Sequence, residues 1–220
     1  MARFGSGALS VALACAALAS PAMGAFAQNA PLKGDPAHGK AISYTCLGCH
    51  GIEGYRNAYP NYSVPRLRGQ YPEYLQAALE EYRSGQRAHT TMHAQASDLS
   101  TQDMADIAAY FAAKPLARGA AATSAHAAPA AAAVCVACHG TDGVGVVSMY
   151  PSLAGQHEDY LEEALREYQN GARKNPVMVG MAAQLKPNDI VAVSEYYASL
   201  RPALKTLPRP YSFLTVHSGE

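Results

Sequence analysis

The sequence has no excess of charge of either sign. Its 220 residues hold 17 Lys plus Arg and 17 Asp plus Glu, and the isoelectric point lies near 7.1. A nucleic-acid binder needs a basic face to neutralise phosphates, and the absence of one argues against this class of function. No apolar run reaches the roughly 20 residues that span a bilayer. We therefore expect the mature protein to be soluble.

Strand patterns and spare cysteines are lacking as well. No stretch of useful length alternates between apolar and polar residues, which favours an all-α fold. Four of the five cysteines lie in two Cys-x-x-Cys-His motifs, and the fifth, Cys15, lies in a segment expected to be removed. No cysteine is left over for a disulfide.

The first 27 residues have the pattern of a secretory signal. Arg3 supplies a short positive region, residues 8–18 are apolar, and Ala25-Phe26-Ala27 fits an A-x-A cleavage site. We predict a signal peptide over 1–27 and an exported mature chain from Gln28. Lipid attachment at Cys15 is the alternative, although the residues before it fit such a site poorly.

The rest of the chain repeats itself. The segment Pro65-x-Leu67-x-Gly69-Gln70 recurs 86 residues later as Pro151-x-Leu153-x-Gly155-Gln156. The same offset relates further pairs: Tyr74 and Tyr160, Leu75 and Leu161, Tyr82 and Tyr168, Gly85 and Gly171, Arg87 and Arg173, Met92 and Met178, Leu99 and Leu185, Tyr110 and Tyr196. This self-similarity indicates two tandem domains related by internal duplication.

The repeat sets the expected domain boundaries. We predict an N-terminal domain over 28–114, a linker rich in Ala and Pro with a degenerate helix over 115–133, a C-terminal domain over 134–202, and a tail over 203–220 that lies beyond the repeat. The two Cys-x-x-Cys-His motifs are 89 residues apart (135 minus 46), so the first copy carries three extra residues. We expect this insertion in a surface loop around Tyr55 to Tyr59.

Apolar residues recur with helical spacing within each copy. This periodicity predicts helices over 71–84 and 157–170, each ended by a glycine. Capping patterns at Ser100 and Pro187 predict further helices to about Ala113 and Leu200. A short helix over 36–45 is expected to lead into the first Cys-x-x-Cys-His motif.

The two motifs carry the chemistry of the chain. They read Cys46-Leu47-Gly48-Cys49-His50 and Cys135-Val136-Ala137-Cys138-His139. In this pattern one helical turn presents two thiols to the vinyl groups of one haem, and the adjacent His binds the iron. We therefore predict two covalent haem c groups, with His50 and His139 as iron ligands.

Other uses of the cysteine pairs fit less well. A zinc site needs the two pairs within about 20 residues, whereas these are about 85 residues apart. A thioredoxin-like pair needs a βαβ context, and no strands are evident. A disulfide across Cys-x-x-Cys is strained and uncommon.

The sixth iron ligand separates a carrier from a catalyst, because an open position invites oxygen, peroxide or substrate. Met92 and Met178 occupy matching positions of the repeat, and we predict that both bind iron. The alternative is that these methionines fill the core. Met181 and His93 are nearby rivals as ligands, although the repeat does not support Met181.

Several repeated residues have two interpretations. The backbone oxygens of Pro65 and Pro151 either hold the second ring nitrogen of each haem-binding His or belong to ordinary turns. Arg87 and Arg173 either pair with haem propionates or, by default, lie on a solvated face. Four repeated tyrosines are expected to be packing residues: Tyr82, Tyr110, Tyr168 and Tyr196.

Together these motifs resemble the class I dihaem cytochromes c of the cytochrome c4 type, across nearly the whole mature chain. The motifs that carry the resemblance are Cys-x-x-Cys-His-Gly, Pro-x-Leu-x-Gly-Gln, Gly-x-Arg, and a Met seven residues before a Leu. The resemblance implies two class I cytochrome c domains related by a pseudo-twofold axis, with haems facing each other across the interface. It also implies Met92 and Met178 as axial ligands.

The resemblance also implies a function. Members of this family are periplasmic electron carriers, often held loosely at the inner membrane, that pass electrons from a quinol-oxidising complex to a terminal oxidase. We expect an electron-transfer protein of this kind, neither an enzyme nor a binder of small-molecule substrates. The main alternative is a cytochrome subunit of a larger oxidoreductase, such as a flavin sulfide dehydrogenase. A dihaem peroxidase or a thiosulfate-oxidising cytochrome would need an open iron.

Overall fold

The computed structural model describes residues 1–2 and 32–209. The predicted signal peptide, apart from residues 1 and 2, lies outside the described residues together with Cys15, the cleavage site and Gln28. So do residues 210–220 of the predicted tail. Among the helices that are described, none is long and apolar enough to cross a membrane.

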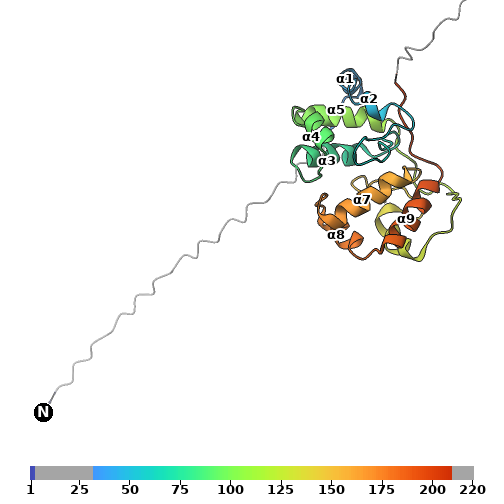
Figure 1. Cartoon of the computed structure of the whole chain (residues 1–220). Coiled ribbons are helices and arrows are strands. Elements are labelled where there is room, and N and C mark those ends of the chain that lie inside the picture. The colour runs from blue at the N-terminus through green and yellow to red at the C-terminus, as the bar shows by residue number, and fades with distance from the viewer. Residues whose placement is uncertain (3–31, 210–220) are drawn as a thin grey trace, which may run out of the picture. The chain divides into compact units, whose positions relative to one another are not determined.

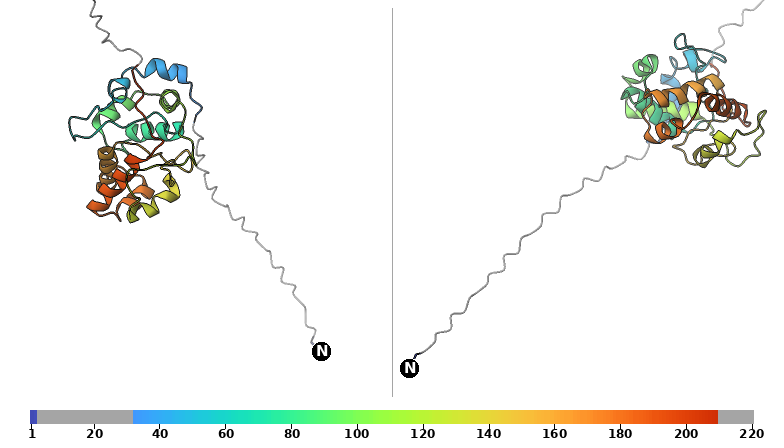
Figure 2. Two further views of the ribbon diagram at one scale, coloured as in Figure 1. Left: turned by 90° about the vertical axis from the view of Figure 1, so that its right-hand side faces the viewer. Right: turned by 60° about the horizontal axis from the view of Figure 1, so that its bottom comes forward.

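The prediction of an all-α fold of two tandem domains is confirmed. The first half contains α1 (Pro36–Ile42), α2 (Leu47–His50), α3 (Pro72–Arg83), α4 (Thr90–Ala96) and α5 (Thr101–Ala112). The second half contains a 3-10 helix, η1 (Ala130–Val134), and then α6 (Val136–His139), α7 (Glu158–Asn170), α8 (Pro176–Ala182) and α9 (Pro187–Ser199). Residues 32–209 form isolated β-bridges but no strands. Figures 1 and 2 show the helices of each half gathered together.

The local sequence explains where these helices begin and end. The Ser100 hydroxyl accepts a hydrogen bond from the backbone N–H of Asp103, and the Asp103 carboxylate accepts one from the backbone N–H of Ser100. This capping box starts α5. Gly171 ends α7 in the left-handed conformation, at φ 81°, which favours a residue without a side chain.

Each half has its own core. In the first half, α3 and α5 pack together and bury Leu47, Leu75 and Phe111. In the second half, α7 and α9 pack together around a core of seven buried residues. These are Ala132, Ala154, Leu161, Val193, Tyr196, Tyr197 and Leu200. The shorter helices α4 and α8 pack against α3 and α7, respectively.

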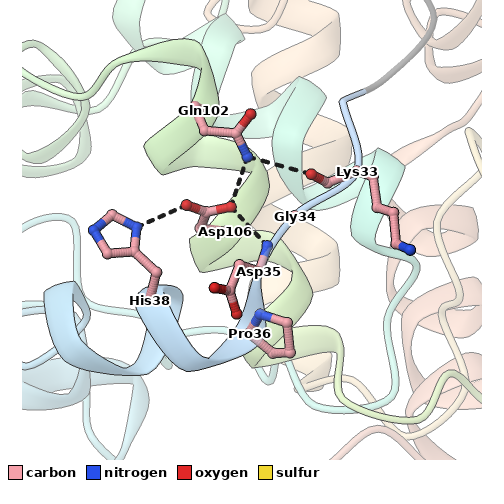
Figure 3. A pocket seen from close by; sticks show the side chains of 7 residues that line it. All are labelled: Lys33, Gly34, Asp35, Pro36, His38, Gln102 and Asp106. Atoms are coloured by element: carbon pink, nitrogen blue, oxygen red, sulfur yellow. Dashed lines mark hydrogen bonds and ion pairs between the residues drawn. The ribbon is translucent and has the colours of Figure 1, made fainter.

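Helix α1 lies unusually close to α5. A Cβ atom added at Gly39 would lie 1.9 Å from the backbone oxygen of Asp106, so only glycine fits there. The Asp106 carboxylate accepts hydrogen bonds from the backbone N–H of Asp35, from the His38 ring and from the Gln102 amide (Figure 3). Asp106 thereby joins the start of α1 to α5.

The segment after α9 returns to the first half of the chain. Lys205 and Arg68 exchange two backbone hydrogen bonds of 3.0 Å each. Leu207 is buried in the first core, beside residues of α2, α3 and α5. Arg209 donates hydrogen bonds of 2.9 Å to the backbone oxygens of Leu47 and Gly48. This part of the predicted tail, residues 203–209, is therefore packed against the first half.

The loop expected to hold the insertion contacts the second half. Arg56 and Ser63 pair in an isolated antiparallel bridge around the turn of this loop. Asp159 on α7 accepts hydrogen bonds from the Arg56 guanidinium, at 2.7 Å, and from the backbone and hydroxyl of Ser63. The extra residues of the first copy thus form a loop that is anchored to α7.

Candidate functional site

The two Cys-x-x-Cys-His motifs adopt the same local structure. Cys46 and Cys135 are the N-caps of α2 and α6, and each helix ends at the His of its motif. In both, the backbone N–H of the His bonds to the carbonyl of the first Cys at 2.9 Å. One helical turn therefore presents both thiols and the imidazole. Within the described part of the chain these four cysteines form no disulfide.

Each motif histidine is held by a proline carbonyl. The Nδ1 of His50 lies 3.0 Å from the Pro65 oxygen, and the Nδ1 of His139 lies 2.8 Å from the Pro151 oxygen. A carbonyl only accepts, so Nδ1 carries the proton and Nε2 keeps its lone pair for a metal. Burial lowers the pKa of both imidazoles and favours this neutral form. Of the two interpretations of Pro65 and Pro151, the structure therefore supports the one in which each proline carbonyl holds a motif histidine.

The two predicted methionine ligands occupy equivalent places in the structure. Met92 is the third residue of α4 and Met178 is the third residue of α8. Both are partly buried. The backbone N–H of each donates to the side chain that caps its helix, His89 for Met92 and Asn175 for Met178, at 3.2 Å in both cases. The two halves therefore hold these methionines in the same local setting.

The rival ligands lie in different surroundings. Met181 lies one turn after Met178 and is 39% exposed. His93 is exposed, and its Nδ1 lies 2.9 Å from the backbone oxygen of Tyr82. Neither rival has an equivalent at the matching position of the other half, where Gln95 and Val179 stand.

Arg87 and Arg173 are buried, so their default assignment to a solvated face is wrong. Their exposed fractions are 3% and 4%. Each guanidinium stacks on two tyrosine rings of its own half, with centroid distances of 5.2 to 5.7 Å. Each also pairs with a glutamate, Glu81 at 2.7 Å for Arg87 and Glu167 at 2.5 Å for Arg173. Stacking on aromatic rings and ion pairing together allow a guanidinium to be buried.

The tyrosines behave as the packing residues that the repeat predicted. Tyr82, Tyr168 and Tyr196 are buried, and Tyr110 packs at the edge of the first core. Burial raises the pKa of Tyr168 to about 12, so its hydroxyl stays protonated.

The residues present fit a haem c in each half. Two thiols and an imidazole with a free Nε2 are the groups that attach and bind a c-type haem, and a thioether completes the His/Met donor set of cytochromes c. Four buried side-chain atoms have no hydrogen-bond partner within the described part of the chain: Arg87 Nε and the hydroxyls of Ser152, Ser194 and Tyr197. Buried donors of this kind need an acceptor, and haem propionates are suitable ones.

Sequence reasoning missed two sets of residues at this site. Gln70 and Gln156 bond across the two halves, and their only signal was their recurrence in the repeat. Arg209, which bonds inside the first motif, has no counterpart in the repeat and gave no signal.

Comparisons with known proteins agree with this geometry. A family model described as cytochrome c matches the chain twice, over residues 36–113 and 124–201. The chain is 35% identical to cytochrome c4 of Pseudomonas aeruginosa over 186 residues, which cover 76% of this chain and 89% of that protein. It is 33% identical to a thiosulfate dehydrogenase electron acceptor of Stutzerimonas stutzeri over 171 residues, which cover 70% of this chain and 78% of that protein.

A solved structure has the same fold. Reduced recombinant cytochrome c4 from Pseudomonas stutzeri superimposes with a TM-score of 0.61 at 31% sequence identity. The match covers 76% of this chain and all of that chain.

Proposed function

Because the chain belongs to the cytochrome c family, we propose that it is a periplasmic carrier that moves single electrons between other redox proteins. It has two covalently bound haem c groups, since each half matches the family model and contains one Cys-x-x-Cys-His motif. When bound, each haem supplies an iron that gains or loses one electron. The observation that carries the proposal is the equivalence of the two halves at every predicted ligand.

In this proposal the chain would supply a histidine and a methionine to each iron. His50 and Met92 serve the first haem, and His139 and Met178 serve the second, while the four motif cysteines form the thioethers: Cys46, Cys49, Cys135 and Cys138. The carbonyl that holds each imidazole and the partial burial of each methionine support this assignment. A thioether on the sixth position closes the iron to substrates and raises its potential. A carrier is therefore favoured over a catalyst.

The proposed partners are redox proteins that exchange electrons one at a time. A quinol-oxidising complex as donor and a terminal oxidase as acceptor follow from the family resemblance. A second candidate donor is a thiosulfate dehydrogenase, because a relative at 33% identity is named as the electron acceptor of such an enzyme. The proposal also includes export through a signal peptide over 1–27, loose association with the inner membrane, and domain boundaries of 28–114 and 134–202.

Replacement of the methionine ligands tests the proposed site. In the holoprotein, Met92→Ala and Met178→Ala should each remove part of the weak Met-to-iron band at the red end of the visible spectrum. Each should also lower the potential of one haem in a redox titration. Met181→Ala is the matched control and should leave both haems unchanged. If neither ligand substitution alters the spectrum, the assignment is wrong.

Reduction kinetics test the role and the partner. The oxidised protein is mixed with purified thiosulfate dehydrogenase plus thiosulfate, or with a quinol-oxidising complex plus quinol, and absorbance is followed. A carrier is reduced rapidly by at least one of them. A stoichiometric flavoprotein that copurifies with the native protein would instead identify it as a subunit of a larger oxidoreductase.

A further inference from the structure

The peptide group that holds His50 is itself bonded to the other half of the chain. The carbonyl of Pro65 accepts from His50 Nδ1 at 3.0 Å. The N–H of that same peptide group belongs to Arg66, and it donates to Gln156 Oε1 at 2.9 Å. In a trans peptide the C=O and N–H point in opposite directions. One planar group thus joins the first imidazole to a side chain of the second half.

The second half shows the same arrangement in reverse. His139 Nδ1 lies 2.8 Å from the Pro151 carbonyl, and the N–H of that peptide group, on Ser152, donates to Gln70 Oε1 at 2.8 Å. Gln70 is a residue of the first half. The connection is therefore crossed, since each glutamine reaches the histidine-holding peptide of the other half.

Further hydrogen bonds fix the orientation of the two glutamine amides. Each amide makes two hydrogen bonds to the backbone of one residue in the other half. Its Oε1 accepts from that residue's N–H, and its Nε2 donates to the same residue's carbonyl: Gln70 to Ser152 O and Gln156 to Arg66 O, both at 3.0 Å. Each Oε1 also accepts from the next backbone N–H, of Tyr71 or His157. Because the neighbouring backbone groups fix which end donates, the amide orientation is determined.

The contacts between Gln70 and Ser152 are shielded from water, and those between Gln156 and Arg66 are partly shielded. Gln70 is 3% exposed, Gln156 is 5% exposed and Ser152 is 2% exposed. Hydrogen bonds are electrostatically stronger in such an environment, and bonds in a chain polarise one another. An acceptor on a peptide N–H therefore increases the negative charge on the carbonyl oxygen of the same peptide group. That carbonyl in turn holds the histidine proton more strongly.

We propose that Gln70 and Gln156 are crossed positioning residues that tune the haem of the opposite half. Gln156 strengthens the hydrogen bond from His50, and Gln70 strengthens the one from His139. A more strongly bonded imidazole is a more basic ligand, which stabilises the oxidised iron and lowers its potential. This inference rests on the proposed role of His50 and His139 as iron ligands.

The test uses Gln70→Met and Gln156→Met in the full holoprotein, because Met keeps the side-chain length but makes neither amide hydrogen bond. The equilibrium constant for reduction of the opposite haem should rise about threefold, or about 28 mV at 59 mV per tenfold for one electron. NMR-monitored redox titration resolves the two haems. The Nδ1 proton of the opposite histidine should move upfield in the reduced protein.

Tyr71→Phe is the matched control. The Tyr71 hydroxyl also bonds across the two halves, to Gly145 O at 2.9 Å, but does not reach either histidine-holding peptide. The Tyr71→Phe variant should weaken the interface between the halves without changing the reduction potential of one haem more than that of the other. A shift of the same-half haem, equal shifts of both haems, or no shift would overturn the proposal. The two mirror variants test it independently, so loss of folding in one leaves the other decisive.

The proposed function can fail separately from this inference. If the wild-type protein lacks His/Met ligation in both halves, its visible spectrum shows this without any glutamine variant. If ligation is intact and the crossed shift is absent, only the inference about the glutamines is wrong.

Discussion

Arg87 and Arg173 occupy matching positions in the two halves, and their backbones pair with each other in an antiparallel bridge. The neighbouring groups complete the pairing: Ala88 N–H donates to Ala172 O at 2.8 Å, and Lys174 N–H donates to Gln86 O at 3.0 Å. Because each arginine pairs with its own counterpart, the local twofold axis of the duplication passes between them. The halves therefore meet at the most buried cations of the molecule's described part.

Removal of one of these cations should destabilise the protein strongly. Arg173→Ala leaves the Glu167 carboxylate buried without its partner, and the free energy of unfolding should fall by about 3 to 5 kcal/mol. Urea unfolding of the holoprotein measures this. Arg166→Ala breaks the more exposed pair with Glu162 on the same helix and should cost only about 0.3 to 0.5 kcal/mol. Similar losses in both variants would contradict the burial argument.

The segment after α9 should stabilise the first half. Leu207 is 8% exposed and packs in the first core, so Leu207→Ala should lower the free energy of unfolding by about 2 to 5 kcal/mol. Leu32, which is 47% exposed, provides the control, and Leu32→Ala should have little effect. Thermal unfolding followed by circular dichroism gives both values. An unchanged melting temperature for Leu207→Ala would mean that the segment contributes nothing.

The close contact of α1 with α5 predicts opposite effects for two glycine substitutions. Gly39→Ala would place a Cβ against the Asp106 backbone, which cannot move freely, and should cost about 1 to 3 kcal/mol or more. Gly180 lies within α8 with open space around it. Gly180→Ala should stabilise the protein by up to about 1 kcal/mol through helix propensity. Equilibrium urea unfolding of the two variants checks the signs.

The docking of α1 should depend on pH. The hydrogen bond to Asp106 raises the pKa of His38, with help from Asp103 and Asp35. A raised histidine pKa contributes stability that is complete below the unfolded value of about 6.5 and is lost as pH rises through the folded pKa. The hydrogen bond from the Asp35 N–H lowers the pKa of Asp106. The stability that the Asp106 carboxylate contributes is therefore fully present above its unfolded pKa of about 3.9, and it is lost as pH falls through its folded pKa.

Asp106→Asn therefore tests this dependence. The difference in unfolding free energy between wild type and variant should be largest between about pH 4 and 6.5, and should shrink above neutral pH. Titrations of His38 by NMR should show a lower pKa in the variant. A difference that grows at alkaline pH would reverse the sign and refute this account.

The four longest helices, α3, α5, α7 and α9, were predictable because their signals are local, whereas α4 and α8 were not predicted and the helix expected over 36–45 ends at Ile42. Apolar spacing and caps placed α3 and α7 within one residue at each end, since the predicted 71–84 and 157–170 became Pro72–Arg83 and Glu158–Asn170. The haem motifs were predictable for the same reason, because one turn of helix contains both cysteines and the histidine.

Contacts between the halves were not predictable from local patterns. Arg87 reads as a surface residue in sequence, but tyrosines and a glutamate of its own half cover its side chain and the other half pairs with its backbone. The recurrence of Gln70 shows that the position matters in both copies, but not that its amide reaches Ser152. Such contacts depend on how two domains dock, which residue spacing within either domain does not specify.

The return of the chain to its first half also constrains how the protein is made. A ribosome produces residues 36–112 long before Leu207 and Arg209, and these late residues complete the core and the motif carbonyls of the first domain. Contacts of such long sequence separation form slowly, because the intervening chain must first be ordered. The first domain therefore has its full set of contacts only after the chain has passed through the second domain and returned to it.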